Sequence, residues 1–142
     1  METSSGTEQR TPDQTGRDGR TDGSAAADVA GLVGDWLDWS QASDQLGVSV
    51  SKVRQLIREH HLAAVVPEPG AGQQIPAALI MDGEIVKGVP GVLTVLHDAG
   101  YEDREVITWL FTADDTLPGR PVDALRENRG SEVKRRAQAM AF

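Results

Sequence analysis

The sequence contains no cysteine, which excludes disulfide bonds, thiol catalysis and cysteine-ligated zinc. Its apolar stretches are short and interrupted by charged residues or glycine, so we expect neither a transmembrane helix nor a secretory signal. A phosphate-binding loop, a dinucleotide-binding fingerprint and a Gly-x-Ser-x-Gly motif are also missing. These absences predict a cytoplasmic protein that is not an enzyme and uses no cofactor.

Large apolar residues are missing from the first part of the chain. Residues 1–28 contain no Val, Ile, Leu, Phe, Trp or Tyr and are rich in Thr, Ser, Gly, Asp and Arg. Such a composition predicts a disordered tail. Its threonines make it either a substrate for a Ser/Thr protein kinase, with Thr7 and Thr11 as the favoured sites, or a leader that only adds solubility.

The rest of the chain is large enough for a modest core. The whole sequence has 142 residues, of which 39% are apolar. We predict a winged helix-turn-helix domain over residues 29–88 and a helical domain over residues 89–142. The expected fold class is therefore α+β, mainly α.

Residues 40–60 carry the signals of two short helices joined by a tight turn. Ser40 is expected to cap a first helix that runs through Leu46, and Gly47 supplies a backbone free to leave it. Ser49 is expected to cap a second helix that runs to about His60. The turn between them is three residues long, as in a helix-turn-helix.

The second helix has one apolar and one polar face. Val50, Val53 and Ile57 share the face that should be buried. On the polar side, Arg suits the acceptor edge of guanine, Gln suits adenine, and Ser and Lys suit phosphates. The alternative is that this polar side is an ordinary solvent-exposed helix face with no ligand. The residues predicted to contact DNA are Ser49, Ser51, Lys52, Arg54, Gln55 and Arg58, together with Gln73 and Gln74 of the hairpin that follows.

Two hairpins are predicted after the second helix. Residues 62–66 and 73–76 read as strands on either side of a Pro- and Gly-rich turn, which would form the wing. Residues 78–81 and 84–87 flank Asp82-Gly83, the favoured two-residue turn of a second hairpin.

Helices are predicted for the remainder. Pro90 marks the start of one helix, and Gly100 marks its end. A second helix opens at residues 101–105, and residues 121–125 and 131–142 complete a helical end. We expect Trp109 of the second helix to be buried against Leu93 and Leu96 of the first.

The net charge of −8 opposes DNA binding, but the charge is unevenly distributed. Residues 49–61 and 117–142 are each net positive, whereas residues 62–116 carry nine carboxylates against Lys87 and Arg104. We expect weak, strongly salt-dependent binding unless the protein forms a homodimer or a particular DNA sequence adds base contacts. The basic run 134–136 either contacts phosphates or forms a solvated helix face.

The three histidines do not form an obvious site. His60 and His61 are neighbours, so their side chains diverge on a helix and make a poor metal-binding pair. His97 next to Asp98 offers no better pair. We therefore predict no catalytic residue and no metal ligand.

Several runs resemble a known family. They are residues 47–54, 86–101, 109–112, 119–125 and 135–140. Together they are similar to an actinobacterial family of small winged helix-turn-helix DNA-binding proteins, over about residues 36–142. The helix-turn-helix run is shared with excisionase-like and MerR-like regulators, and the C-terminal runs are more specific. The resemblance implies a winged helix with a helical C-terminal domain, cytosolic binding of double-stranded DNA, and a link to membrane Ser/Thr protein kinases acting on a flexible N-terminus.

The C-terminal part has a second resemblance. Residues 109–112 followed by 117–125 and a closing helix are similar to the partner-binding domain of a class of antitoxins. That similarity implies a protein-interaction module. The leading interpretation is therefore a DNA-binding transcriptional regulator or nucleoid-associated factor, and the alternative is a protein-interaction adaptor or antitoxin-like module.

Overall fold

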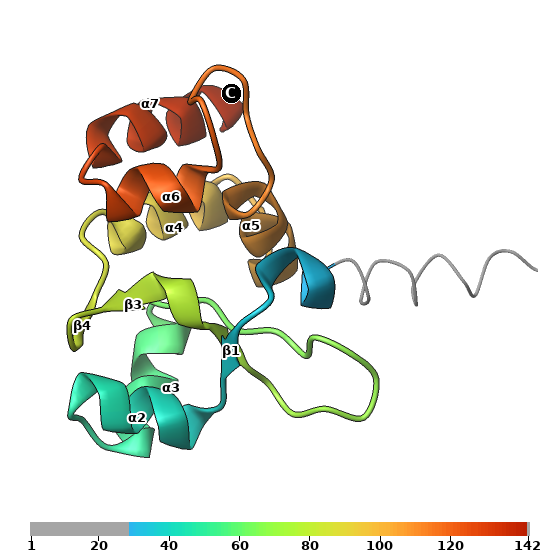
Figure 1. Ribbon diagram of the computed structural model, residues 1–142, viewed down its shortest axis with the longest axis vertical. Helices are drawn as coiled ribbons and strands as arrows, with labels where there is room; N and C mark the ends of the chain where they lie inside the picture. The colour runs from blue at the N-terminus through green and yellow to red at the C-terminus, as the bar shows by residue number, and fades with distance from the viewer. Residues whose placement is uncertain (1–28, 142) are drawn as a thin grey trace, which may run out of the picture.

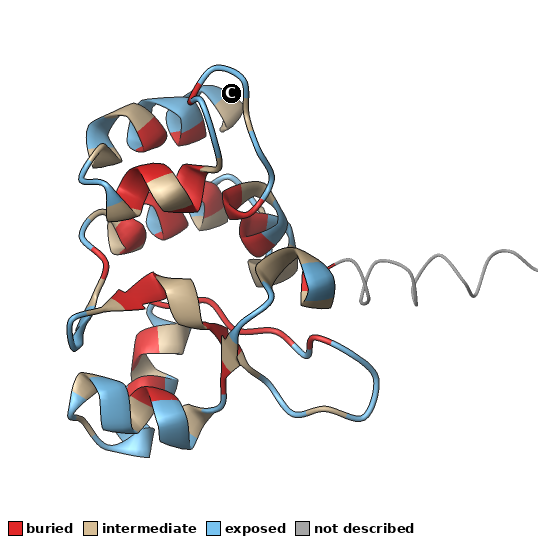
Figure 2. Ribbon diagram, viewed as in Figure 1, coloured by how far each residue is buried: buried red, intermediate tan, exposed pale blue. Residues whose placement is uncertain are grey.

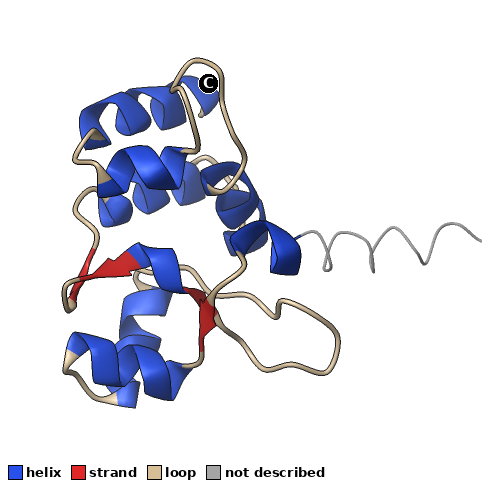
Figure 3. Ribbon diagram, viewed as in Figure 1, coloured by secondary structure: helices blue, strands red, loops and turns tan. Residues whose placement is uncertain are grey.

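The computed structural model describes residues 29–141, in which α2 and α3 lie at one end and α4 to α7 at the other (Figure 1). Helices dominate, and the short strands lie between the two groups (Figure 3). The helices are a segment over residues 29–33, α2 (Trp39–Leu46), α3 (Val50–Arg58), α4 (Val89–Asp98), α5 (Asp103–Leu110), α6 (Pro121–Arg126) and α7 (Gly130–Met140). The strands are β1 (Trp36–Leu37), β2 (Ile75–Pro76), β3 (Ile80–Met81) and β4 (Glu84–Ile85), with a 3₁₀ turn at Ala77–Leu79.

The first helix of the pair, α2, begins two residues earlier than predicted. Its N-cap is Asp38 and not Ser40, which lies inside the helix. Asp38 Oδ1 accepts a hydrogen bond from the Gln41 N–H at 2.7 Å, and the Asp38 N–H donates to Gln41 Oε1 at 2.8 Å. This reciprocal capping box satisfies two backbone donors, whereas Ser40 offers no such partner three residues later.

The second predicted hairpin is present but shorter. β3 and β4 pair antiparallel around Asp82-Gly83, where both residues have positive φ. The predicted strand start at Ala78 is wrong, because Ala77–Leu79 form a 3₁₀ turn. That turn places the Leu79 side chain in the core at 0% exposure.

The wing is an open loop more than a regular hairpin. Strand β2 pairs antiparallel with β1, so the predicted return strand 73–76 finds most of its partners outside the hairpin. The predicted strand 62–66 contributes one bridge, in which Val65 and Gln74 exchange hydrogen bonds of 3.0 and 2.7 Å. The segment between them projects from the body as a long loop (Figure 1).

Residues 63–66 are held by α5 instead of a second wing strand. The Ala64 N–H donates to Asp103 Oδ2 at 3.0 Å, and Arg104 Nη2 donates to the Val66 carbonyl at 2.9 Å. Prolines at 67 and 69 lack the N–H groups that a longer ladder would need. These contacts explain why the wing pairing stops after one bridge.

The C-terminal helices follow the sequence pattern closely. α4 begins after Gly88, which has a φ of 93°, with Pro90 in its first turn. A side chain at residue 88 would also meet Leu125, because an added Cβ would lie 2.9 Å from Leu125 Cδ2. The sequence pattern predicts that Val92, Leu93, Val95 and Leu96 of α4 face inward; three of them are buried, and Val95 is only partly buried.

Full burial of Trp109 is not observed. Its side chain is only partly buried on α5, whereas its neighbours Leu110 and Phe111 are 0% and 2% exposed. Val106, Ile107 and Leu110 are the buried residues of α5, so the core-facing stripe passes through Leu110 and Trp109 lies beside it. Trp109 packs at the edge of the core.

One continuous cluster of buried residues links both ends of the molecule (Figure 2). Arg126 of α6 adds a polar link, since its Nη1 donates to the Ala78 and Ile80 carbonyls at 2.8 and 3.4 Å. The C-terminal helices therefore support the strands beneath which α2 and α3 pack. Among residues 29–141, no helix is long and apolar enough to cross a membrane.

Candidate nucleic-acid interface

The turn between α2 and α3 has the predicted length and caps. Gly47 ends α2 in the left-handed conformation, with φ 69°. Ser49 caps α3, because its Oγ accepts a hydrogen bond from the Lys52 N–H at 3.0 Å. α3 ends at Arg58, and His60 turns the chain away with φ 60°. This geometry sets the direction in which the polar face of α3 points.

The exposed face of α3 carries two arginines side by side. Ser51, Arg54 and Arg58 are all exposed and surround one surface hollow of about 270 Å³. Within residues 29–141, neither guanidinium forms an ion pair with a carboxylate. Both cations are therefore available to an anionic ligand such as a phosphate or to the acceptor edge of a base.

The buried face of α3 differs from the prediction at one residue. Val53 is 0% exposed, Leu56 is 9% exposed and Ile57 is partly buried, but Val50 is 41% exposed. On a helix with 3.6 residues per turn, the centre of the core-facing stripe falls between Val53, Leu56 and Ile57. Val50 then lies at the edge of that stripe, next to Arg54. The prediction that Val50 is buried was wrong. It left Leu56 out of the apolar face, and including Leu56 moves the centre of that face away from Val50.

The other candidate contacts on α3 differ in availability. Lys52 is exposed, and Ser49 is exposed although its hydroxyl oxygen is used by the cap. Gln55 is partly buried, and its Nε2 donates to Glu59 Oε2 at 3.0 Å. A base contact by Gln55 would have to replace that intrahelical hydrogen bond.

Trp39 contacts Arg54 of the exposed α3 face, and the sequence alone did not indicate this contact. Trp39 is the first residue of α2, and the Arg54 Cζ lies 5.3 Å from the centre of its ring. A guanidinium over an indole face is attracted by the ring quadrupole. Trp39 therefore restricts the conformations open to Arg54. The only sequence signal was a tryptophan directly after a capping aspartate.

A second, more apolar hollow connects α2, α3 and the wing. It has a volume of about 510 Å³ and is lined by Asp38, Trp39, Ser40, Val50, Gly72 and Gln73. Gln73 is exposed there, whereas Gln74 is partly buried and its backbone is used by the bridge to Val65. The structure thus brings Gln73 close to the start of α3, and it gives Gln74 a structural role in the wing.

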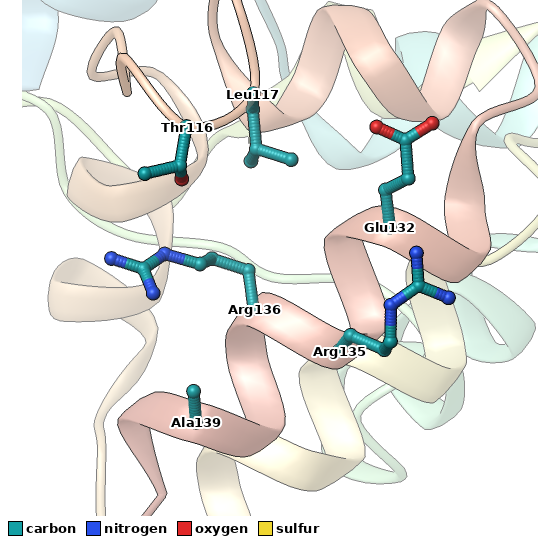
Figure 4. Close-up of a pocket in the computed structure, with 6 residues that line it drawn as sticks. All are labelled: Thr116, Leu117, Glu132, Arg135, Arg136 and Ala139. Carbon is teal, nitrogen blue, oxygen red and sulfur yellow. The ribbon is translucent and has the colours of Figure 1, made fainter.

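The basic run on α7 lies in the C-terminal part. Figure 4 shows that Arg135 and Arg136 point to different sides of a hollow of about 290 Å³. Arg136 Nε lies 3.4 Å from Asp114 Oδ2. Hydrogen bonds from Thr116, followed by that from Arg136, lower the pKa of Asp114. Arg136 is therefore engaged within the fold, while Lys134 and Arg135 are exposed.

A cluster of His and Asp forms where sequence neighbours did not suggest one. The sequence analysis considered His60 and His61 as a metal-binding pair. In the structure His60 instead stacks on His97, with ring centroids 3.9 Å apart. His97 Nε2 also lies 2.7 Å from Asp103 Oδ1. These residues come from separate elements, so no local spacing could have indicated the cluster. The predicted phosphorylation sites Thr7 and Thr11 lie outside the described residues.

Comparison with known proteins identifies the family. Residues 24–80 match the model of the winged helix-turn-helix domain of the DNA-binding protein Rv2175c, and residues 86–141 match that of the Rv2175c C-terminal domain of unknown function. The chain is 45% identical to the DNA-binding protein Rv2175c of Mycobacterium tuberculosis over 118 residues, which cover 74% of this chain and 80% of the relative. The chain belongs to the Rv2175c family.

The solved structure of a family member agrees with the fold. The NMR structure of Rv2175c matches with a TM-score of 0.69 and 44% identity, covering 76% of this chain and 82% of that structure. The predicted fold class, a winged helix-turn-helix with a helical C-terminal part, is confirmed. So is the resemblance to an actinobacterial family of small winged helix-turn-helix proteins. The similarity of the C-terminal part to antitoxin domains stays a prediction.

Proposed function

We propose that this chain binds double-stranded DNA through the exposed face of α3 and the adjacent wing residue Gln73. The observation that carries the proposal is the pairing of Arg54 and Arg58 around one hollow on the second helix of a helix-turn-helix. In such motifs the second helix enters the major groove and its side chains reach base edges. The name of the relative, DNA-binding protein Rv2175c, supports the same function.

Each side chain has a role in this proposal. Arg54 and Arg58 bind guanine edges or phosphates, and Ser51 and Lys52 bind phosphates. Gln73, in the wing, contacts the sugar–phosphate backbone of the DNA. Ser49 acts mainly by capping α3, since its Oγ already accepts the Lys52 N–H. Gln55 is a weaker candidate because of its hydrogen bond to Glu59.

Binding of this kind depends steeply on salt. The chain carries a net charge of −8, so long-range repulsion opposes the local attraction of the α3 cations. We infer that a homodimer or a specific sequence is needed for tight binding at physiological salt. The chain acts without chemistry, as a cytoplasmic, nucleoid-located transcriptional regulator or nucleoid-associated factor.

The test is a charge-matched pair of variants. Arg54→Ala with Arg58→Ala removes two cations from α3, and Lys87→Ala with Arg135→Ala removes two exposed cations outside the helix-turn-helix. Each lost base contact costs about 1–3 kcal/mol, so the first variant should lose binding by about tenfold or more. The second should bind within about threefold of the native protein, because distant charges are screened. Equal losses in the two variants would contradict the assignment to α3.

Regulation by a kinase is a further part of the proposal. Residues 1–28 carry five threonines, and each phosphate adds a charge of about −1.5 to −2 near pH 7. A phosphorylated tail would compete with DNA for Arg54 and Arg58. DNA affinity of unmodified, kinase-treated and tail-deleted protein at one salt concentration tests this. Labelling of Thr7 or Thr11 with unchanged affinity would reject the switch and leave DNA binding by α3 intact.

The alternative function is a protein-interaction adaptor that uses the C-terminal part. Residues 86–141 match a domain of unknown function, and the resemblance of this part to antitoxin domains implies that it binds a partner protein. A salt titration with unrelated duplexes separates the two functions. Binding that weakens steeply with salt supports phosphate contacts, whereas no binding at low salt favours the adaptor.

A further inference from the structure

A cluster of metal-ligand side chains lies at the junction of α3 with the C-terminal helices. His60 follows α3, His97 lies near the end of α4, and Asp103 is the first residue of α5. One ligand atom of each residue lies within 4.8 Å of the others, and all three side chains are partly buried. Two imidazoles and a carboxylate are the donor set that first-row divalent ions such as Zn²⁺ accept.

Two ring nitrogens in this cluster have no hydrogen-bond partner. His60 Nδ1 and His97 Nε2 are both inaccessible to solvent and unpartnered among the described residues. His97 Nε2 lies 2.7 Å from Asp103 Oδ1, but the contact lacks the alignment of a hydrogen bond. Buried polar atoms without partners are costly, and a cation that accepts both lone pairs would remove that cost.

The carboxylate is already oriented by a neighbouring group. Asp103 Oδ2 accepts a hydrogen bond of 3.0 Å from the Ala64 N–H, which leaves Oδ1 directed toward His97. Metal-binding carboxylates are typically fixed by such a second hydrogen bond. The backbone donor at Ala64 therefore prepares Asp103 to act as a ligand.

We propose that His60, His97 and Asp103 form a binding site for a divalent transition-metal ion of the Zn²⁺ type. Three protein ligands leave a fourth position for water. The ion would join the end of the proposed DNA-reading helix to α4 and α5. This proposal stands on the cluster itself and does not depend on DNA binding.

Ion binding requires a change in the two rings. The imidazoles are stacked, with centroids 3.9 Å apart and an interplanar angle of 21°. A metal–nitrogen bond of about 2.0–2.1 Å lies in the plane of each ring, so the stacked rings must turn apart to share one ion. Their ring resonances should therefore report binding directly.

The chain offers an internal control for that measurement. It has three histidines, and His61 lies outside the cluster although it is adjacent to His60. ZnCl₂ is added stepwise to the full-length, untagged protein while the imidazole proton signals are followed by NMR. The expected result is a change in the His60 and His97 signals that saturates at one ion per chain, with the His61 signals unchanged.

Substitutions test the ligand set. Asp103→Asn keeps an acceptor for the Ala64 N–H but loses the charged ligand, and it should weaken Zn²⁺ binding by about tenfold or more. Asp98→Asn is the matched control, because it removes an exposed carboxylate next to His97 in sequence. His97→Ala should abolish binding and His61→Ala should not. Thermal unfolding without metal checks that each variant is folded.

Three outcomes would overturn the proposal. They are unchanged His60 and His97 signals at saturating ZnCl₂, parallel unsaturable changes in all three histidines, and equal Zn²⁺ affinity of the native, Asp103→Asn and Asp98→Asn proteins.

Discussion

The guanidinium of Arg54 lies over the indole of Trp39, with Cζ 5.3 Å from the ring centre. The contact joins the first residue of α2 to the exposed face of α3, so one helix of the pair orients a cation of the other. Trp39 lines the apolar hollow that reaches the wing and Arg54 lines the hollow shared with Arg58, so the contact joins residues of both hollows.

Replacing Trp39 with Leu should weaken DNA binding by about two- to fivefold, which corresponds to a cation–π contribution of about 0.5–1 kcal/mol. The measurement is DNA affinity of the native protein, both single variants and the double variant with Arg54→Ala. Because Trp39 is proposed to act through Arg54, its substitution should have little effect once Arg54 is gone. Additive losses in the double variant would show that Trp39 acts independently of Arg54.

Val50 and Val53 provide a matched comparison within α3. Val53→Ala should lower the free energy of unfolding by about 2–3 kcal/mol, because Val53 is 0% exposed. Val50→Ala should change it by less than about 0.5 kcal/mol, because Val50 is 41% exposed. Urea unfolding measures both values. Similar losses at the two positions would contradict the orientation of α3.

Trp109 and Leu110 test the packing of α5. Leu110→Ala should cost about 2–5 kcal/mol, since Leu110 is 0% exposed. Trp109→Ala should cost about 1–3 kcal/mol, less than a fully buried tryptophan, because its side chain is partly exposed. Chemical denaturation of the two variants gives the comparison. A cost of about 4 kcal/mol or more for Trp109 would show that it is buried in solution.

The Arg120–Asp123 pair predicts a pH dependence of stability. Arg120 Nε and Nη2 donate to the two carboxylate oxygens of Asp123 at 2.8 and 3.0 Å. These hydrogen bonds lower the pKa of Asp123 and raise that of Arg120. A depressed carboxyl pKa in the folded state stabilises the protein above the unfolded-state pKa of about 3.9, and the contribution is lost as the pH falls through the folded-state value.

Asp123→Asn should therefore destabilise the protein at pH 7, and its effect should be smaller at pH 2, below the unfolded-state pKa of about 3.9. The side chains of the pair are 37% and 40% exposed, so solvent screening limits the loss at pH 7 to about 1 kcal/mol. Urea unfolding at both pH values measures the difference in the free energy of unfolding between native and variant protein. If this difference is the same at both pH values, the substitution acts through packing and not through charge.

Local signals explain what could be predicted from the sequence. Ser49, Gly47 and Asp82-Gly83 each act through neighbouring backbone groups, and each has its predicted role. The cap of α2 was also local, since Asp38 and Gln41 have capping-box spacing, but Ser40 was preferred wrongly. Short-range hydrogen bonds such as helix caps can thus be predicted from the sequence when all neighbouring residues able to cap the helix are compared.

Long-range contacts account for the errors and omissions. β2 pairs with β1, some 40 residues away in the chain, so the wing could not be inferred from its own alternation. The stacking of His60 on His97 and the contact of Arg54 with Trp39 depend on how helices pack. The boundary predicted between residues 88 and 89 stays a prediction.

NMR titration of a short DNA duplex into ¹⁵N-labelled protein tests the central claim most directly. If α3 and the wing form the DNA-binding surface, amide signals from the turn after Gly47, from α3 and from residues near Gln73 should shift together. The predicted result is that signals of α6 and α7 stay in place at the same DNA concentration. Shifts confined to α4–α7, with α3 unchanged, would contradict the account.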